Sequence, residues 1–599
     1  MPDSSARNRL LTAVAASIAA IVYATVQLRV VLTADPGAFR ALRTAFWHDQ
    51  LGYLSIVADV ATGNLDSVEP VTVTGVNHYP RTYYALVGLA ARATGMDAVT
   101  AWNVISALIQ LTAVVVLAVA MSVLARRWWV GALAPLPFLT GTLSAVTSGS
   151  WLTGLEHHAV LWGPYGALFS NNAETAGLSI IVIVLSALAL VWARPSRLGA
   201  RITVSVLAAA ALGSLSGFQT YSFITGIYLL SVILAGVYLR RARWGWIAAT
   251  AAAVPVVIFV GPLIADRVGQ LPTLVFGLLP AVPGLIRGLM ATRGGLALYA
   301  AITVATAAPQ IGWTVSGILG GDPFLAYRVA SNVNLGVVDL RTVIASLPLV
   351  LPFLLLTAIA ARRRDSFAVA ALIGTGATAA MLALNDRWGA NAEPYRFWID
   401  LFLLGGVVLA LGAARLYGGV PTRTEARSSD QHTTRSTPLW IRAAAAVCAL
   451  VYVVSLADLW QYSTDATMNA TWNPGSSRET AIAAAARAAD PSEEGLIVSD
   501  TCIDPRTMKV VSAAPIAYFY LGMAWPAEVD AVSEVMTGRD NDLLPADSLA
   551  VSRTRWLVTD SACASVPVLD GAEKAREDSF DYAGTEGSGT ITLWRLSTP

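Results

Sequence analysis

The chain has 599 residues, of which 55% are hydrophobic and 13% are charged, and its formal net charge is +1. The charged fraction is about half of the roughly 25% found in soluble domains, and a lipid bilayer explains the deficit because charges at its centre are costly. The balanced charge excludes a global field that favours nucleic acid. We therefore expect a membrane protein without a nucleic-acid partner.

The first apolar run begins after Arg7 and Arg9 and continues to about Leu32. It starts like a signal peptide, but no small-residue cleavage pattern ends it, so we predict an uncleaved first span. Similar stretches of roughly 18–25 residues recur along the chain and predict about thirteen transmembrane helices. They cover residues 10–33, 99–124, 129–149, 176–193, 201–219, 221–239, 245–265, 272–292, 295–315, 341–361, 366–385, 397–416 and 439–459. Pro280 and Pro283 leave open whether 272–315 makes two full spans or a re-entrant segment.

Arginines mark the ends of these runs and predict the orientation of the chain. If the N-terminus is cytoplasmic, thirteen spans place every arginine cluster inside and the C-terminus outside, as the positive-inside rule requires. The clusters are Arg7/Arg9, Arg126/Arg127, Arg194/Arg197/Arg201, Arg240/Arg241/Arg243, Arg362/Arg363/Arg364 and Arg423/Arg427/Arg435. We predict a multi-pass plasma-membrane protein with a polar cytoplasmic loop at 417–438. The loops left outside are 34–98, 150–175, 316–340 and 386–396.

The first outside loop, 34–98, contains two predicted interfacial helices, an amphipathic one at 37–62 and a shorter one at 83–95. In the first, His48 and Asp49 lie between aromatic residues and an apolar helix face. Partial burial of a carboxyl group there raises its pKa and favours a role as a base. Asp49 also suits the N-cap of a helix beginning at the next residue, and the two roles are compatible.

The second helix follows the motif Asn77-His78-Tyr79-Pro80-Arg81-Thr82-Tyr83-Tyr84. We predict that Tyr83 and Tyr84 belong to an aromatic belt at the membrane interface. His78 and Arg81 are candidates for lining a polar cavity, and Arg81 is a candidate for binding a lipid phosphate.

The second outside loop contains Glu156-His157-His158, followed by Asn171, Asn172 and Glu174. The run suggests a metal site, but adjacent residues on a helix point about 100° apart and no companion ligands are evident. A solvated polar loop or a sugar-binding surface is the preferred reading.

The last outside loop contains Asp386 and Arg387 and leads to Arg396 at the mouth of a late span, with Asp400 just inside it. Arg396 suits either snorkelling to the interface or a bidentate hold on a phosphate. An acid inside a span is usually paired, and the i, i+4 spacing predicts that Asp400 pairs with Arg396.

The tail from 461 to 599 changes character. GLIVSD at 495–500, RWLVTD at 555–560 and TITLWRL at 590–596 predict strands, and helical stretches lie between them. We predict a small extracytoplasmic α/β domain, in which a disulfide between Cys502 and Cys563 is allowed. No cysteine–histidine spacing in the sequence is typical of a zinc site.

Several of these segments resemble one family. The first-loop segments WHDQLGYLSIVADVATGN and HYPRTYYALVGLAARATG, the late YRFWIDLFLLGG element and the outside α/β tail resemble the GT-C superfamily of membrane glycosyltransferases. Within it, the arrangement is similar to actinobacterial arabinofuranosyltransferases, above all those that prime arabinan on galactan. The resemblance implies a GT-C-like catalytic module at 1–460 that takes polyprenyl-phosphate sugars.

The implied activity is inverting transfer of a sugar, with arabinofuranose as a candidate, to a cell-envelope glycan acceptor such as arabinogalactan. The resemblance makes Asp49 the base that deprotonates the acceptor hydroxyl, with Arg396 and Arg81 near the donor phosphate. Many members have two acids in this loop, whereas Gln50 follows Asp49 here, so we expect no cofactor and favour a metal-independent enzyme, with a divalent metal as the alternative. The remaining substrate-binding candidates are His48, Gln50, Tyr53, His78, Glu156, His157, Asp386 and Arg387.

Two other functions compete with this one. A lipid-linked sugar transporter or flippase needs polar residues at the midplane of several spans, and the spans here are mostly Ala, Val, Leu and Gly. A non-catalytic envelope-assembly protein does not need polar groups that converge on Asp49.

Overall fold

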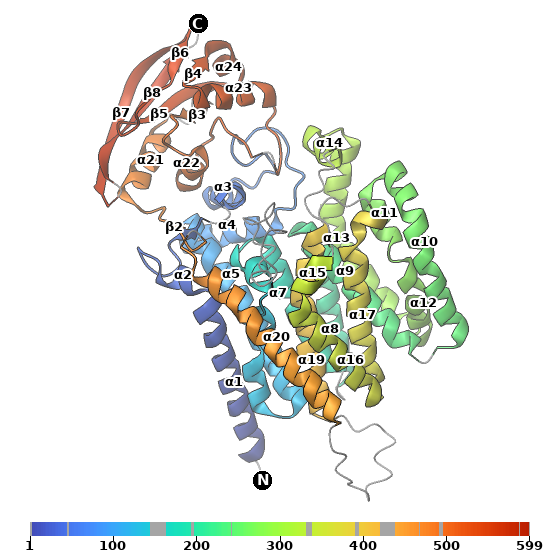
Figure 1. Ribbon diagram of the computed structural model, residues 1–599. Coiled ribbons are helices and arrows are strands. Elements are labelled where there is room, and N and C mark those ends of the chain that lie inside the picture. The colour runs from blue at the N-terminus through green and yellow to red at the C-terminus, as the bar shows by residue number, and fades with distance from the viewer. Residues whose placement is uncertain are drawn as a thin grey trace, which may run out of the picture.

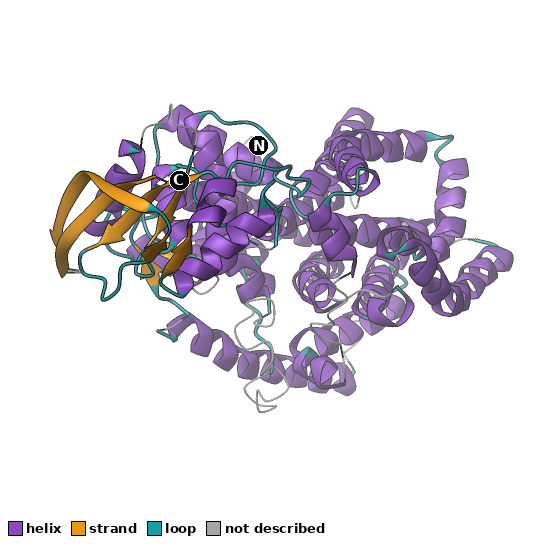
Figure 2. Cartoon of the chain, turned by 90° about the horizontal axis from the view of Figure 1, so that it is seen from above, coloured by secondary structure: helices purple, strands orange, loops and turns teal. Residues whose placement is uncertain are grey.

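The computed structural model is a bundle of long helices with a sheet-containing C-terminal region at one end (Figure 1). It describes residues 3–44, 47–143, 163–192, 197–240, 242–330, 338, 340–389, 394–419, 438–466, 468–489, 495–520, 522–585 and 587–597. Seen from above, the strands gather at one edge of the molecule, beside the helices (Figure 2).

Up to residue 464 the described chain is almost entirely helical. Its helices are α1 Asp3–Gln27, α2 Arg29–Thr33, α3 Trp47–Thr62, α4 Thr82–Thr94, α5 Ala98–Ala125, α6 Pro164–Phe169, α7 Ala173–Trp192, α8 Leu198–Ser214, α9 Thr220–Leu239, α10 Trp244–Val268, α11 Gln270–Phe276, α12 Val282–Ala291, α13 Gly295–Leu319, α14 Pro323–Ala330, α15 Leu340–Ala345, α16 Leu347–Arg362, α17 Ser366–Ala383, α18 Asn385–Trp388, α19 Pro394–Tyr417 and α20 Leu439–Thr464. Among the described residues, eleven helical segments are long and apolar enough to cross a membrane. The predicted class, a polytopic helical membrane protein with a small C-terminal α/β region, is confirmed.

The predicted helix at 129–149 is wrong over its described part. Residues Trp128–Leu133 and Leu136–Phe138 form two short 3-10 helices, and the chain then runs irregularly to 143. Pro135 and Pro137, two residues apart, remove the amide donors that a continuous helix needs. The irregular backbone is stabilised by contacts with the rest of the protein. Tyr452 of α20 donates a hydrogen bond to the Leu136 carbonyl at 3.2 Å, and the Phe138 side chain is buried.

Two other predicted spans are interrupted. The segment 341–361 is divided between α15 and α16, and α16, with 16 residues, is shorter than the usual spanning length. Near Pro280 and Pro283, a 3-10 turn at Leu279–Ala281 separates α11 from α12, whereas α13 is continuous. The prolines therefore break the first helix of this pair and leave the second intact.

The end of α16 and the start of α20 lie at the end of the bundle opposite the C-terminal region (Figure 1). Arg363 donates to the Leu416 carbonyl at 2.6 Å, and the Arg362 guanidinium lies 5.6 Å from the Trp440 ring. Arg126 caps the end of α5. Ser170 lies beside the first loop, because Gln50 donates a hydrogen bond to its carbonyl. Arg126 and Ser170 therefore lie at opposite ends of the bundle. The side of the membrane on which the arginine clusters lie stays a prediction.

The first loop contains α3 and α4, where two interfacial helices were predicted. The first begins ten residues later than predicted and is preceded by β1, Leu42–Arg43. The two helices touch closely, since a Cβ on Gly88 would lie 2.6 Å from the Val60 side chain. Val57 and Val60 of α3 are fully buried, so this helix belongs to the protein core.

The C-terminal region has the predicted strands and additional ones. Its elements are β2 Thr471–Trp472, α21 Ser477–Ala488, β3 Leu496–Ser499, α22 Pro505–Ser512, α23 Val529–Asp540, β4 Leu543–Pro545, α24 Ala546–Val551, β5 Thr554–Asp560, β6 Val568–Asp570, β7 Glu573–Gly584 and β8 Gly587–Ser597. The main sheet has the order β3-β5-β8-β7, with β3 and β5 parallel and the other pairs antiparallel. Apolar residues of α21 and α22 pack on one face, and those of α23 and α24 on the other.

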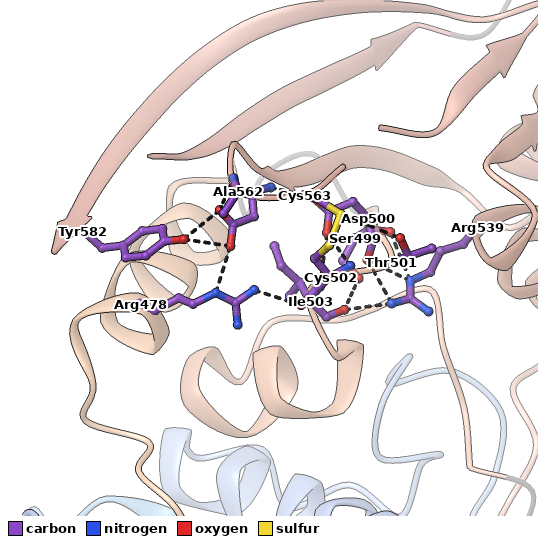
Figure 3. The surroundings of a disulfide bond; sticks show 11 residues. Arg478, Ser499, Asp500, Thr501, Cys502, Ile503, Arg539, Ala562, Cys563 and Tyr582 are labelled. Atoms are coloured by element: carbon purple, nitrogen blue, oxygen red, sulfur yellow. Dashed lines mark hydrogen bonds and ion pairs between the residues drawn. A yellow bond between two sulfur atoms is a disulfide. The ribbon is translucent and has the colours of Figure 1, made fainter. Parts of the chain in front are cut away.

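A disulfide joins Cys502 and Cys563, which follow the ends of the parallel strands β3 and β5 (Figure 3). Asp500 beside it accepts hydrogen bonds from the amides of Cys502, Ile503 and Asp560. The sequence separation of 61 residues makes this a long-range link between two strand ends.

Candidate functional site

Asp49 lies half-buried in the first turn of α3. The helix begins at Trp47, so Asp49 is not its N-cap, as the sequence suggested, but a residue within the first turn. A carboxylate there is favoured by the positive end of the helix dipole. Its Oδ1 accepts a hydrogen bond from the hydroxyl of Tyr520, which comes from the C-terminal region.

Two further tyrosines flank Asp49. The hydroxyl groups of Tyr53 and Tyr79 lie 3.2 Å apart, and Tyr53 stacks on Tyr84 with a centroid distance of 4.7 Å. Burial raises the pKa of both Tyr53 and Tyr79, and the negative charge of Asp49 adds to the rise. These phenols therefore stay neutral and can serve as hydrogen-bond donors beside the carboxylate.

The prediction of an interfacial aromatic belt at Tyr83 and Tyr84 is wrong. Each side chain is only 1% exposed. Both rings pack against Trp102 of α5, with centroid distances of 6.2 and 5.7 Å. Because α4 packs on α3 and α5, its tyrosines fill the core behind the site instead of facing the interface.

Arg396, in the first turn of α19, acts electrostatically on Tyr79 and Tyr520. Its guanidinium lies 3.8 Å from Glu174 of α7 and 5.3 Å from the Tyr221 ring of α9. The positive charge of Arg396 and the negative charge of Asp49 act in opposite directions on the pKa of Tyr79 and of Tyr520. The first loop, the start of α19 and the C-terminal region thus meet at one place.

Glu174, not Asp400, is the ion-pair partner that the structure gives Arg396. The Asp400 carboxyl is fully buried, accepts a hydrogen bond from Thr225 at 3.1 Å and interacts with the Glu174 side chain. The charge of Arg396 also acts on the Asp400 carboxyl, but more weakly than the charge of Glu174 does. The predicted i, i+4 pair is replaced by a pair between helices, because α7 packs against α19.

His48 and Gln50 flank Asp49 and face different neighbours. Arg506 of α22 donates to Nδ1 of His48, so a second side chain of the C-terminal region touches α3 beside Asp49. The Gln50 side chain is buried and donates to the Ser170 carbonyl at 2.9 Å. Gln50 therefore fixes α3 to the segment before α7.

His78 and Arg81 make contacts within the protein. His78 Nδ1 lies 3.0 Å from the Trp313 carbonyl of α13, and its Nε2 lies 3.9 Å from Asp322. The Arg81 guanidinium donates to the carbonyls of Leu65 and Asp66. His78 therefore lies against α13, and Arg81 binds the backbone of the first loop. Among the contacts that the structure describes, neither side chain is joined to Asp49.

Asp386 and Arg387 of α18 pair with each other at 3.1 Å, and the Arg387 side chain is 71% exposed. The described contacts do not bring them to the tyrosines around Asp49. Glu156 and His157 lie outside the described residues. Within the described part of the chain, the one cluster of three potential metal-ligating groups is Asp500, Cys502 and Cys563, whose thiols are joined as a disulfide.

Sequence reasoning missed three residues of this site: Glu174 as the partner of Arg396, and Tyr520 and Arg506 from the tail. The sequence signal that could have pointed to Tyr520 is the aromatic run Ala517-Tyr518-Phe519-Tyr520, which lies outside the predicted strands. Nothing in the sequence indicates that Tyr520 contacts Asp49 of α3, which lies 471 positions earlier in the chain.

No family model matches the chain, and no curated protein matches it either. Among solved structures, the archaeal oligosaccharyltransferase AglB from Archaeoglobus fulgidus, in complex with an inhibitory peptide and a dolichol-phosphate, is similar at 12% identity and a TM-score of 0.48, over 94% of this chain and 70% of that one. ArnT from Cupriavidus metallidurans bound to undecaprenyl phosphate is similar at 14% identity and a TM-score of 0.45, over 96% and 97%. The arabinofuranosyltransferase AftD from Mycobacteria is similar at 13% identity and a TM-score of 0.49, over 99% of this chain and 40% of that one.

Proposed function

We propose that the chain is an inverting glycosyltransferase of the GT-C kind that transfers a sugar from a polyprenyl-phosphate donor to a hydroxyl group of a glycan. One observation carries the proposal. A half-buried carboxylate, Asp49, accepts a hydrogen bond from Tyr520, and the charges of Asp49 and of Arg396, in the first turn of α19, both act on the pKa of Tyr79 and of Tyr520. Base and cation are the two groups that such a transfer requires.

The proposed reaction is a single displacement. The acceptor hydroxyl gives its proton to Asp49 while its oxygen attacks the anomeric carbon of the donor. The bond between that carbon and the phosphate oxygen breaks, the electron pair leaves with the polyprenyl phosphate, and the anomeric configuration inverts. Arg396 stabilises the negative charge that collects on the departing phosphate, a role that suits the planar guanidinium.

The position of Arg396 supports this role. It lies in the first turn of α19, a segment long and apolar enough to span the membrane, so its guanidinium is near the level at which a lipid phosphate sits. Its present partner Glu174 lies 3.8 Å away. A bound phosphate would offer oxygens for the bidentate hydrogen bonds that arginine makes best.

We further propose arabinofuranose as the sugar, a cell-envelope glycan as the acceptor, and the outer face of the plasma membrane as the place of transfer. The first-loop segments and the YRFWIDLFLLGG element support the sugar by resemblance, and the arginine distribution supports the side. On this reading the C-terminal region and Asp49 are extracytoplasmic.

Turnover of defined donors tests the proposal. Membranes that carry the protein are supplied with polyprenyl-phosphate arabinofuranose, mannose or glucose and a soluble glycan acceptor. We expect consumption of one donor, release of free polyprenyl phosphate and a product whose new linkage has the anomeric configuration opposite to that of the donor. Consumption of none of these donors, or retention of configuration, would contradict the proposal.

A further inference from the structure

Two side chains of the C-terminal region contact the first turn of α3. The Tyr520 hydroxyl donates to Asp49, and the Arg506 guanidinium donates to His48. Consecutive residues of the first loop are thus held by a part of the chain that follows the last membrane helix.

A buried ion pair and backbone hydrogen bonds hold these contacts in place. Nζ of Lys509, a fully buried side chain of α22, lies 2.6 Å from the Asp59 carboxylate of α3. The Ile516 amide donates to the Val71 carbonyl at 3.0 Å, and Val71 belongs to the apolar core under the sheet. The first loop and the C-terminal region therefore share one core.

The segment that carries Tyr520 approaches α3 too closely for a side chain at Gly52. A Cβ there would lie 2.7 Å from Cε of Met523 and 3.3 Å from the Tyr520 ring. Met523 and Tyr520 both pack against the main helical core of the protein. The Tyr520 ring is thus fixed over the first turns of α3, one helical turn from Asp49.

We propose that Tyr520 is a positioning residue of the transfer reaction, which holds the Asp49 carboxylate toward the acceptor hydroxyl, and that the C-terminal region thereby completes the active site. The inference rests on the proposed function. Tyr520 occupies Oδ1 and leaves Oδ2 to receive the acceptor proton. Burial raises the pKa of Tyr520, so its hydroxyl stays protonated and donates to the carboxylate.

The hydrogen bond fixes the orientation of the Asp49 carboxylate, because a neutral phenol donates to one of its two oxygens. The other titratable and charged groups around Asp49 are Tyr53 and His48 on α3, Tyr79 from the loop before α4, Arg396 on α19 and Arg506 on α22. Loss of the Tyr520 hydroxyl alone therefore removes one donor and leaves these groups unchanged.

The test compares Tyr520→Phe with Tyr518→Phe in full-length protein. Tyr518 loses the same atom two residues away, and its ring packs beneath Arg506 with 5.6 Å between the guanidinium and the ring centroid. We expect Tyr520→Phe to lower kcat/KM for the acceptor by about 10-fold or more, the size typical for one hydrogen bond to a charged group. We also expect the fall to lie in kcat, with an unchanged KM for the lipid donor, because the proposed role of Tyr520 is to orient Asp49 and not to hold the donor. Tyr518→Phe should match the wild type in both measurements.

Equal unfolding temperatures of the purified Tyr520→Phe variant and the wild type will show that the ring still packs. If they differ, Tyr520→His, which keeps a ring donor, is compared in the same two measurements and is expected to fall between wild type and Tyr520→Phe. An unchanged kcat and an unchanged kcat/KM in Tyr520→Phe, with Asp49→Asn inactive, would overturn the positioning role and leave the proposed function standing. Full activity of Asp49→Asn would instead remove the proposed function itself.

Discussion

Among single residues, Arg396 is the side chain to which the proposed mechanism assigns the donor phosphate. Replacement by Lys keeps the charge but removes the planar pair of donors that fits a phosphate. We expect Arg396→Lys to raise KM for the lipid donor about 10-fold or more, by analogy with the loss of one charge-assisted hydrogen bond. Initial rates measured against donor concentration check this.

Arg442→Lys is the matched control. Arg442 is an exposed arginine near the start of α20, at the end of the bundle away from Asp49. This variant should keep the wild-type KM for the donor. Equal KM values for Arg396→Lys and the wild type would mean that Arg396 does not contact the phosphate.

The residues of the site were only partly predictable. Asp49 and Arg396 stand out in the sequence because each is polar at the edge of an apolar segment. The partner of Arg396 was assigned incorrectly, since sequence spacing reports neighbours on one helix and Glu174 is brought in by α7. Tyr520 was not predictable, because its contact with Asp49 depends on how the C-terminal region packs on the first loop.

At the scale of elements, the turn between α3 and α4 contains a fully buried acid, Glu69. Its carboxylate accepts hydrogen bonds from the Val71 amide at 3.0 Å and from the Thr72 amide and hydroxyl at 2.6 Å. Burial nevertheless raises its pKa from 4.5 to about 7. The folded protein thus keeps this proton to a higher pH than the unfolded chain does.

Because the pKa of Glu69 is higher in the folded state, its contribution to stability is fully present below about pH 4.5 and is lost as the pH rises to about 7. The loss is on the order of 3 kcal/mol. We expect the unfolding temperature of the purified protein to fall between pH 5 and pH 7.5 by more in the wild type than in Glu69→Gln. An identical fall in the two proteins would show that Glu69 does not titrate in this range.

Most elements could be predicted because their signals are local. The long apolar runs and the three strands 495–500, 555–560 and 590–596 appear near the predicted places, since length, hydropathy and alternation determine them. The segment 129–149 failed because hydropathy alone does not register Pro135 and Pro137, which lie two residues apart and remove two amide donors from one turn.

At the scale of the whole molecule, the C-terminal region is attached to the first loop by the buried pair Asp59–Lys509. Loss of one partner of a buried pair costs on the order of 3–5 kcal/mol, because the other charge is left alone, whereas replacing both with apolar residues is often neutral. We expect Lys509→Met to lower the unfolding temperature of the purified protein and to increase cleavage of the C-terminal region by added protease. The double variant Asp59→Leu with Lys509→Met should recover much of the loss.

The comparison of single and double variants is decisive for this attachment. If Lys509→Met is as stable as the wild type, the pair does not hold the two parts together. If the double variant is no better than the single one, the cost comes from lost packing of the lysine side chain and not from a stranded charge. This long-range attachment was not visible in the sequence, where the two residues are 450 positions apart.

Sugar transfer at Asp49, as proposed, requires its carboxylate. Turnover of the accepted polyprenyl-phosphate sugar is compared in membranes carrying wild type, Asp49→Asn or Asp66→Asn, at matched protein levels. Asp66 is an exposed acid of the same loop. We expect a fall of about 100-fold or more for Asp49→Asn, within the range typical for loss of a general base, and wild-type turnover for Asp66→Asn. Wild-type turnover by Asp49→Asn would contradict the proposed role of Asp49.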